Sequence, residues 1–318
     1  NLNKALDGSK YSEWHETVHP IINDYLQKFG YYDIFIVNTK GDIVYSVFKE
    51  IDFATNLLNG PHDNTNFARA YQKALALPKS DLYVIEDFDF YDPSYHAPAS
   101  FIASPIFKEN NMIGVLIMQM PVDYINSAMT GDNGWEKDGL GKTGETYLIG
   151  EDYYMRSNSR FLIEDKKEYI NLLEKLNVKE NTLNLINQLN TSILLNNVET
   201  DIAHKVVSGQ TGTEITKDYR GEKVLSSYTP LNIEGLNWYI VSEIDSTEAF
   251  EPIYKIRLFV ILIGLVLLFI SIILANKIAK TFTKSILVLK LSLKALKTLT
   301  TNEIGVLVLL DKVRTNSK

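Results

Sequence analysis

An uncharged apolar run near the C-terminal end constrains the fold of this chain more than any other feature. Residues 258–275, LFVILIGLVLLFISIILA, contain no charged side chain, and Arg257 and Lys277 bracket them. As an α-helix this run would be roughly 27 Å long, close to the hydrocarbon core of a bilayer at about 30 Å. A helix of a soluble domain normally keeps a polar face, and this run has none. The sequence therefore predicts a transmembrane helix over residues 256–276.

The charges on the two sides of this run predict its orientation. Residues 277–318 hold nine lysines or arginines against two acidic residues, whereas the whole chain has a net charge of −7. Because the basic flank of a membrane helix stays in the cytoplasm, we expect residues 277–318 to be cytoplasmic and residues 1–255 to be periplasmic or extracellular. An outer part this acidic would repel nucleic acid, so no nucleic-acid partner is expected. Since the chain begins at Asn1, we also expect a lost upstream membrane segment.

The first patterned segment is a helix that carries a metal-site motif. Apolar residues recur at helical spacing over residues 11–29, and within them His15, Glu16 and His19 spell HExxH. On a helix the two imidazoles could bind Zn²⁺ while the glutamate serves as base, which would make the chain a membrane-anchored zinc metalloprotease. We favour a packing role instead, because Pro20 is expected to disfavour helical geometry at His19 and no third ligand is evident.

The following residues predict an antiparallel sheet flanked by helices. Residues 64–77 read as a helix that Asn64 or Thr65 would cap. Around this helix the alternating apolar pattern of β-strands occurs at residues 31–48 (two strands across a Gly-containing turn), 81–91, 99–107 and 111–120. These segments would make a sheet of about five antiparallel strands.

A similar order of elements then occurs a second time. The strand pattern that begins at Asp33 matches one that begins at Glu145, and Pro105 and Pro230 occupy similar places between two later strands. A duplicated module with a helical insertion near residues 166–177 explains both matches. The segment between the copies contains GLGKTG, but this glycine motif lacks the preceding strand and following helix of a nucleotide site. No nucleophile motif is present, so the chain is expected to have no catalytic residue, bound metal or cofactor.

The expected fold class is therefore α+β, with two antiparallel sheets between a long N-terminal helix and a transmembrane helix. Beyond the membrane, apolar residues recur in steps of four and three over about two heptads, which indicates either a parallel helical bundle between two subunits or a basic amphipathic helix on the inner leaflet. The predicted domains are an N-terminal helix (1–30), two modules (31–130 and 131–250), the transmembrane helix (256–276) and a cytoplasmic linker (277–318).

Four passages make the chain resemble a known family: FGYYDIFIVNTKGDIVYSVFKEIDFATNLLNGP, PASFIASPIF, GKTGETYLIGEDYYMRSNSRF and YRGEKVLSSYTPLNIEGLNWYIVSEID. Together they cover about residues 10–250 and are similar to the double Cache sensor ectodomains of bacterial transmembrane receptors. The resemblance implies two PAS-like modules, of which the membrane-distal one usually binds a small molecule. Residues 277–318 partly resemble a HAMP linker, with a second helix that would begin near Asn302.

The resemblance implies an extracytoplasmic small-molecule sensor in a bacterial inner membrane, not an enzyme. We expect a chemoreceptor, with the sensor part of a histidine kinase or nucleotide cyclase as the alternative. The partners would be a polar small-molecule ligand, the membrane and a second copy of the chain, which would meet through the N-terminal and juxtamembrane helices. Asp245 and Glu248 are expected to form a capping box where the last strand leads into the membrane helix.

The predicted ligand site lies in the first module. Alternation along VYSVFK would place Tyr45 and Lys49 on one face, where they could hold an anion or carbonyl group. Asp87 and Tyr91 flank the next strand, where Asp87 could accept a hydrogen bond, and Gln119 ends the last strand. Outside this module we expect Arg156 and Arg160 to make structural salt bridges, with an anion site as the alternative.

Overall fold

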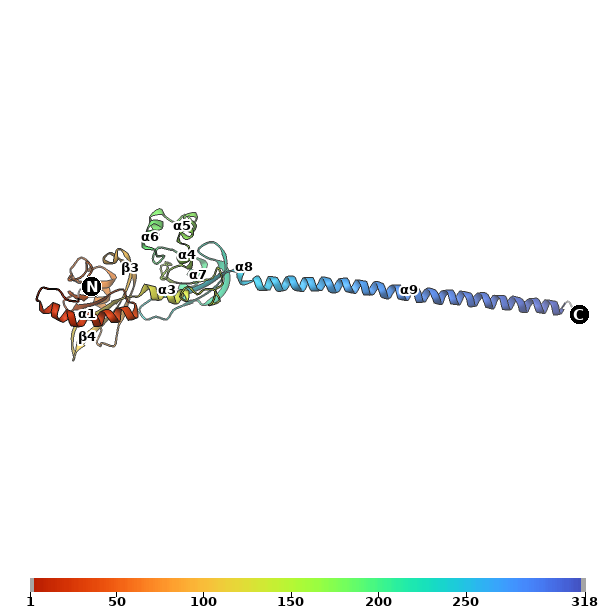
Figure 1. The fold of residues 1–318 in the computed structure, drawn as a ribbon, viewed down its shortest axis with the longest axis horizontal. Coiled ribbons are helices and arrows are strands. Elements are labelled where there is room, and N and C mark those ends of the chain that lie inside the picture. The colour runs from red at the N-terminus through yellow and green to blue at the C-terminus, as the bar shows by residue number, and fades with distance from the viewer. Residues whose placement is uncertain (1–2, 316–318) are drawn as a thin grey trace. The chain divides into compact units, whose positions relative to one another are not determined.

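A computed structural model describes residues 3–315 of this chain (Figure 1). The chain divides after Ala249 into a unit that holds all the strands and a second unit that consists of one long helix. The predicted α+β class with two antiparallel sheets is confirmed.

The first helix, α1 (Lys10–Phe29), runs through Pro20 without ending. It begins at Ser9, whose side chain accepts a hydrogen bond from the Ser12 N–H, and it ends at Gly30 in the left-handed conformation. The expectation that Pro20 removes His19 from helical geometry is wrong. Proline costs the helix one backbone hydrogen bond, and burial of the helix face that holds His19 and Leu26 offsets that loss.

The first sheet has the strand order β2-β1-β5-β4-β3, with every neighbouring pair antiparallel. Leu26 of α1 packs with Ile34 and Tyr45 in one apolar cluster, and Phe67 of α2 (Asn66–Leu75) packs with Phe35 and Phe101 in another. Because the side chains of Ile34 and Phe35 point to opposite faces of β1, the two helices cover opposite faces of this sheet. The bounds of its strands are β1 (Ile34–Asn38), β2 (Ile43–Ser46), β3 (Val84–Tyr91), β4 (Ala97–Lys108) and β5 (Asn111–Gln119).

The helix α2 (Asn66–Leu75) is capped as the sequence predicts. The side chain of Thr65 accepts a hydrogen bond from the Ala68 N–H, and Asn66 is the first helical residue. After β3, a short 3-10 helix, η1 (Asp92–Ser94), turns the chain into β4. We call this sheet, with α1, α2 and η1, the first module.

The second sheet, with the order β6-β9-β8-β7, repeats the order β1-β5-β4-β3 of the first. The partner of β6 across the expected turn is reduced to an isolated bridge between Ile149 and Met155. The predicted helical insertion is present after β6. We call this sheet and its helices the second module, whose elements are β6 (Glu145–Gly150), α4 (Arg160–Glu164), α5 (Lys166–Lys175), α6 (Glu180–Leu189), α7 (Asp201–Val207), β7 (Gly212–Lys217), β8 (Lys223–Pro230) and β9 (Trp238–Asp245).

The two modules are joined by α3 (Val122–Thr130) and share an apolar cluster. In this cluster Phe88 of the first module stacks on Trp238 of the second, with ring centroids 5.7 Å apart and planes 3° from parallel. Leu148, Ile193 and Leu236 of the second module complete its buried part. The modules therefore pack against each other through side chains as well as through the connecting helix.

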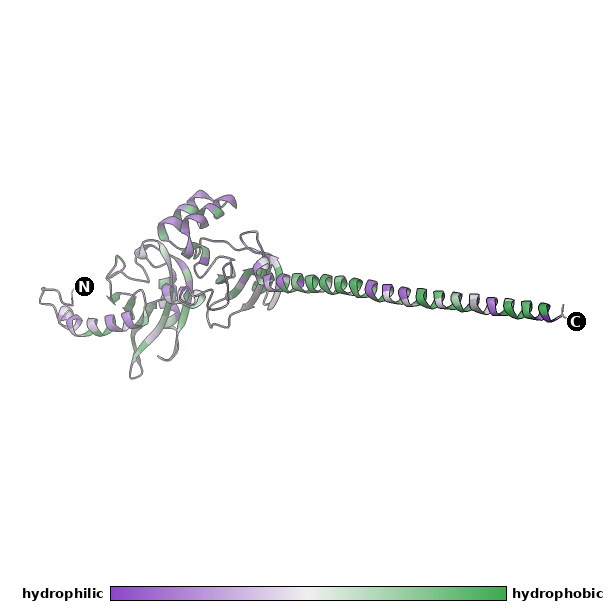
Figure 2. Cartoon of the chain, turned by 45° about the vertical axis from the view of Figure 1, so that its right-hand side comes forward, coloured by the Kyte–Doolittle hydropathy of each residue, from purple (hydrophilic) through white to green (hydrophobic). Residues whose placement is uncertain are grey.

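After β9, the short helix α8 (Ser246–Ala249) ends the first unit, and α9 (Glu251–Thr315) forms the second. Among residues 3–315, α9 is the one helix long and apolar enough to cross a membrane, and Figure 2 shows the unbroken apolar stretch in its first part. The break expected before Asn302 is absent. No proline or glycine interrupts residues 297–302, and the hydroxyls of Thr300 and Thr301 bond back to carbonyls of the preceding turn.

Candidate functional site: a cleft where the two modules meet

A cleft of about 890 Å³ lies where the first module meets the second. This volume is within the range of small-molecule sites, roughly 300–1,000 Å³. The first module contributes the end of α1, the segment after β2, η1 and the end of β5, and the second module contributes Asn158 and the residues around Thr191. A molecule bound here would contact both modules.

Backbone features at the cleft hold its walls in place. Gly30 turns the chain out of α1 with φ +69°, and a side chain there would collide with the Tyr124 ring. Tyr95 and His96 adopt the left-handed region with φ 58° and 60°, which is uncommon for residues other than glycine. This turn leaves Tyr95 81% exposed at the mouth of the cleft. Backbone strain of this kind concentrates at ligand-binding and switch regions.

Glu50 is the most deeply placed charged residue of the cleft. Its Oε1 atom accepts a hydrogen bond from the Tyr32 hydroxyl at 3.2 Å, and its Oε2 atom is buried with no hydrogen-bond partner within 3.5 Å. Burial raises the pKa of Glu50, and the nearby Asp52 adds to this effect. Burial and the Glu50 carboxylate together raise the pKa of Tyr32 to about 12. The carboxylate therefore has an unused acceptor atom at the cleft wall.

Gln119 is the one predicted ligand residue that lines the cleft. It ends β5, is buried, and its Nε2 atom donates to the Ser94 hydroxyl at 3.2 Å. Both groups reach the cleft, where they could exchange their mutual hydrogen bond for one to a ligand. A ligand role for Gln119 stays a prediction.

Tyr91 lies in the core of the first module. Its ring packs edge-on against Phe67 and Phe101, and its hydroxyl donates to Asp52 Oδ2 at 2.7 Å. Asp52 is fully buried, and burial raises its pKa. Tyr91 therefore supports a buried carboxylate next to Glu50, and its own role in ligand binding stays a prediction.

Tyr45 and Lys49 come together, but beneath α1. Lys49 follows β2 with φ 54°, donates from Nζ to the Ser46 carbonyl, and lies 5.0 Å from the centre of the Tyr45 ring. The Tyr45 hydroxyl is 2.8 Å from Nδ1 of His19. Neither residue lines the cleft, and their predicted contact with an anion or carbonyl stays a prediction.

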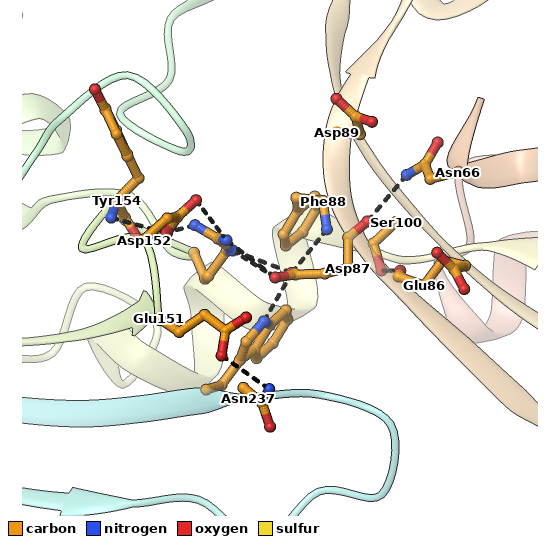
Figure 3. A network of polar contacts seen from close by, with 12 residues as sticks. Asn66, Glu86, Asp87, Phe88, Asp89, Ser100, Glu151, Asp152, Tyr154 and Asn237 are labelled. Carbon is orange, nitrogen blue, oxygen red and sulfur yellow. Dashed lines mark hydrogen bonds and ion pairs between the residues drawn. The ribbon is translucent and has the colours of Figure 1, made fainter. Parts of the chain in front are cut away.

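Asp87 joins the two modules. Its carboxylate accepts hydrogen bonds from the Arg156 Nε at 3.0 Å and from the Trp238 indole N–H at 2.8 Å, so both donors come from the second module (Figure 3). Arg156 is nearly buried and also donates to Asp152 at 3.0 Å. The expected structural role of Arg156 is confirmed by these ion pairs. The Phe88 backbone N–H donates to the same carboxylate at 2.7 Å, so a ligand would have to compete with donors from both modules.

The HExxH motif sits on α1 with both imidazoles buried. The rings of His15 and His19 stack with centroids 4.4 Å apart, whereas Glu16 points to Lys4 and forms an ion pair at 2.9 Å. Burial, with Lys49 and His15 nearby, lowers the pKa of His19 to about 4, so this imidazole is neutral at pH 7. Within residues 3–315, no group of three His, Cys, Asp or Glu side chains is placed so that it could hold a metal ion.

The GLGKTG loop contacts Glu248 of α8, the short helix after the last strand. The carboxylate of Glu248 accepts hydrogen bonds from the backbone N–H groups of Lys142 and Thr143 at 2.8 and 2.9 Å. Asp245 instead pairs with Arg220. The expected capping box between Asp245 and Glu248 is therefore wrong, because each carboxylate has a stronger partner from the second module.

Sequence reasoning missed Glu50, although it lies one residue beyond the predicted Lys49. Tyr31 and Tyr32, which also line the cleft, fell in a segment assigned to a strand. The cleft draws on segments that are far apart in the chain, so no local pattern marks it. The local pattern that could have indicated Glu50 is FKEIDF, residues 48–53, in which a glutamate lies between two phenylalanines shortly after a strand.

The sequence model of one family, described as Cache domain, matches residues 7–253. No curated protein sequence matches the chain significantly. The similar solved structures include the ligand-binding domains of two amino-acid chemoreceptors of Pseudomonas aeruginosa PAO1. PctC, in complex with GABA, is 11% identical, with 76% of this chain and 84% of that chain covered and a TM-score of 0.44. PctB, in complex with L-Arg, is 16% identical, with 76% and 77% covered and a TM-score of 0.44.

A third similar structure is the ligand-binding domain of the Pseudomonas fluorescens chemoreceptor CtaA in complex with L-leucine. It is 10% identical, with 75% of this chain and 89% of that chain covered and a TM-score of 0.40. The family match extends over most of the chain and includes every strand of both modules.

Proposed function

Because the chain belongs to the Cache domain family, we propose that it is the extracytoplasmic small-molecule sensor of a bacterial transmembrane signal transducer. We assign ligand binding to the cleft between the modules and signal output to α9. A chemoreceptor is our first choice for the transducer, and a histidine kinase or a nucleotide cyclase is the alternative. The match to the Cache family over residues 7–253, directly before an apolar helix, carries this proposal.

The cleft supports the ligand-binding part of the proposal because both modules form its walls. A ligand that contacts both modules binds most tightly in the arrangement that brings its contacts together, and it shifts the population only by this differential affinity. The Asp87–Arg156 contact bridges the same two modules. We propose that this contact sets the arrangement on which the ligand acts.

The strand β9 supports the output part of the proposal. It begins at Trp238, which donates to Asp87 of the first module, and it ends at Asp245, directly before α8. A strand of this length spans roughly 25 Å. Glu248, which follows, is held by the backbone of residues 142 and 143. One rigid strand therefore connects the module junction to the segment that precedes α9.

We further propose that residues 31–130 form the membrane-distal module, residues 131–250 the proximal module, residues 256–276 the membrane span and residues 277–318 a HAMP-like linker. The acidic first unit would be outside and the basic end of α9 inside. Exposed aromatic residues on α1, among them Trp14 and Tyr25, would contact a second copy of the chain. The chain would thus work as a homodimer.

A ligand screen joined to disulfide crosslinking tests the proposed function. The chain contains no cysteine, so a single cysteine at Leu262 would report on the approach of two α9 helices. We would screen amino acids, amines and organic acids by thermal shift on the full chain in detergent. We expect at least one class to raise the melting midpoint and to change the rate of crosslinking. If no compound raises the midpoint, or if a compound raises it and leaves crosslinking unchanged, the result contradicts the proposal.

A further inference from the structure

The charged residues that line the cleft are all acidic. Glu50 and Asp123 contribute carboxylates, and within residues 3–315 no lysine, arginine or histidine lines the cleft. Lys49, which precedes Glu50 in the chain, lies over the Tyr45 ring and donates to the Ser46 carbonyl. A ligand in the cleft therefore meets negative charge with no basic side chain to neutralise it.

Aromatic rings form another part of the wall. Tyr31, Tyr32, Phe48 and Tyr95 line the cleft, and the rings of Tyr32 and Phe48 lie 6.2 Å apart with their planes 57° from parallel. The faces of such rings carry partial negative charge and attract cations within about 6 Å of the ring centre. The remaining polar side chains are amides and hydroxyls, which bind charged and neutral groups alike.

Glu50 gives the site a specific acceptor. Its Oε2 atom is buried without a hydrogen bond, and a buried acceptor in this state is destabilising until a donor reaches it. Asp52, which lies behind Glu50, is also a buried carboxylate with one unpaired oxygen. A protonated amine at the cleft wall would supply both the missing donor and the missing positive charge.

From these three observations we infer that the cleft recognises an organic cation, namely an amine without a carboxylate group. A carboxylate on the ligand would meet two acidic residues and no basic residue, so amino acids should bind less well than the amines that correspond to them. This inference rests on the proposed function, because it names the class of molecule that the sensor binds.

A set of four related compounds tests the inference by calorimetry on the full chain in detergent. These are 1,5-diaminopentane, lysine (the same diamine with a carboxylate), pentane-1,5-diol and glutarate. We expect binding in that order, with 1,5-diaminopentane at least about tenfold tighter than lysine. Equal or tighter binding of lysine, the diol or glutarate would overturn the inference and leave the sensor function in place, as would an absence of diamine binding. Failure of every compound in the wider screen would instead contradict the sensor function.

Two variants and two matched controls locate the binding. Glu50→Gln keeps an acceptor for the Tyr32 hydroxyl, so the fold should be preserved, and we expect it to weaken 1,5-diaminopentane about tenfold. Asp123→Asn, at the exposed rim, should weaken it a few-fold at most. The controls Glu174→Gln and Asp63→Asn remove the same charges from exposed positions outside the cleft and should change affinity less than twofold. Unchanged affinity in a folded Glu50→Gln protein would overturn the inference.

Discussion

Removal of the Asp87 carboxylate should weaken the contact between the two modules. It should do so more than removal of any other acidic side chain of β3. The Asp87→Ala variant leaves Arg156, which is 5% exposed, with Asp152 as its remaining ion-pair partner. It also leaves the Trp238 indole N–H without its acceptor. The substitution thus costs an ion pair and a hydrogen bond at one place.

The magnitude follows from how buried each partner is. Truncation of one partner of a fully buried ion pair costs about 3–5 kcal/mol. The Asp87 side chain is 35% exposed and Arg156 retains one partner, so we reduce this to about 2 kcal/mol. An indole N–H left unpaired adds about 1 kcal/mol. A loss of about 3 kcal/mol corresponds to a fall of roughly 6–12 °C in the melting midpoint for a unit of this size.

The assay is thermal unfolding of the full chain in detergent, followed by circular dichroism. Asp89→Ala is the matched control, because Asp89 lies on the same strand and its ion pair with Arg69 is about half exposed on both sides. Such a pair contributes at most about 1 kcal/mol, so this control should lower the midpoint by no more than roughly 4 °C. Asp87→Asn should fall between the two, because its amide oxygen can still accept from the indole. If Asp87→Ala melts within 2 °C of Asp89→Ala, the assignment of Asp87 as the connection between modules is refuted.

Three other predictions concern the first module. Burial raises the pKa of Asp33 to about 7 from 3.8, so the folded state binds the proton more tightly than the unfolded state. The contribution of Asp33 to the free energy of unfolding should therefore fall as pH rises from about 4 to about 7. Asp33→Asn can still accept both close backbone hydrogen bonds through Oδ1, so it should flatten this part of the plot of melting midpoint against pH. Parallel plots for the variant and the unaltered chain would contradict this prediction. Thr65→Ala removes the α2 cap and should lower the free energy of unfolding by about 1 kcal/mol, which lowers the melting midpoint by roughly 2–4 °C. Thr65→Ser keeps a hydroxyl and should lower the midpoint less. Equal midpoints for the two variants would show that the cap is unimportant. Because His15 and His19 have no third ligand within residues 3–315, chelation by EDTA should leave the melting midpoint unchanged. A fall of several degrees together with stoichiometric zinc would instead support the metalloprotease hypothesis.

Local patterns were sufficient for much of the fold. The apolar run, the alternation of the strands and a helix cap at Asn64 or Thr65 each depend on residues close together in the chain, so the sequence predicts them directly. The local cost of Pro20 alone predicts the wrong geometry at His19, because burial of the surrounding helix face offsets that cost. The helix break expected before Asn302 is absent for a different reason, since no proline or glycine there stops the helix.

The candidate site depended on contacts that no local pattern reveals. Asp87 meets Arg156 across 69 positions and Trp238 across 151 positions. In the sequence alone, each of these residues is equally consistent with a surface charge or a core aromatic residue. The cleft forms only when both modules are in place, so its lining cannot be derived from either module's sequence alone. Gln119 and Glu50 both line it, and the sequence analysis predicts only Gln119.

Cysteine labelling of the full gene product in intact cells tests the central claim most directly, namely that the apolar part of α9 separates an outer sensor from an inner transmitter. Residues 1–318 contain no cysteine, so once any cysteine elsewhere in the gene product is replaced, Glu234→Cys and Lys312→Cys would each provide one label site, before and after the apolar run. With a maleimide that passes the outer envelope but not the inner membrane, Glu234→Cys should react in intact cells and Lys312→Cys only after lysis. Labelling of Lys312→Cys in intact cells, or protection of Glu234→Cys until lysis, would contradict the account.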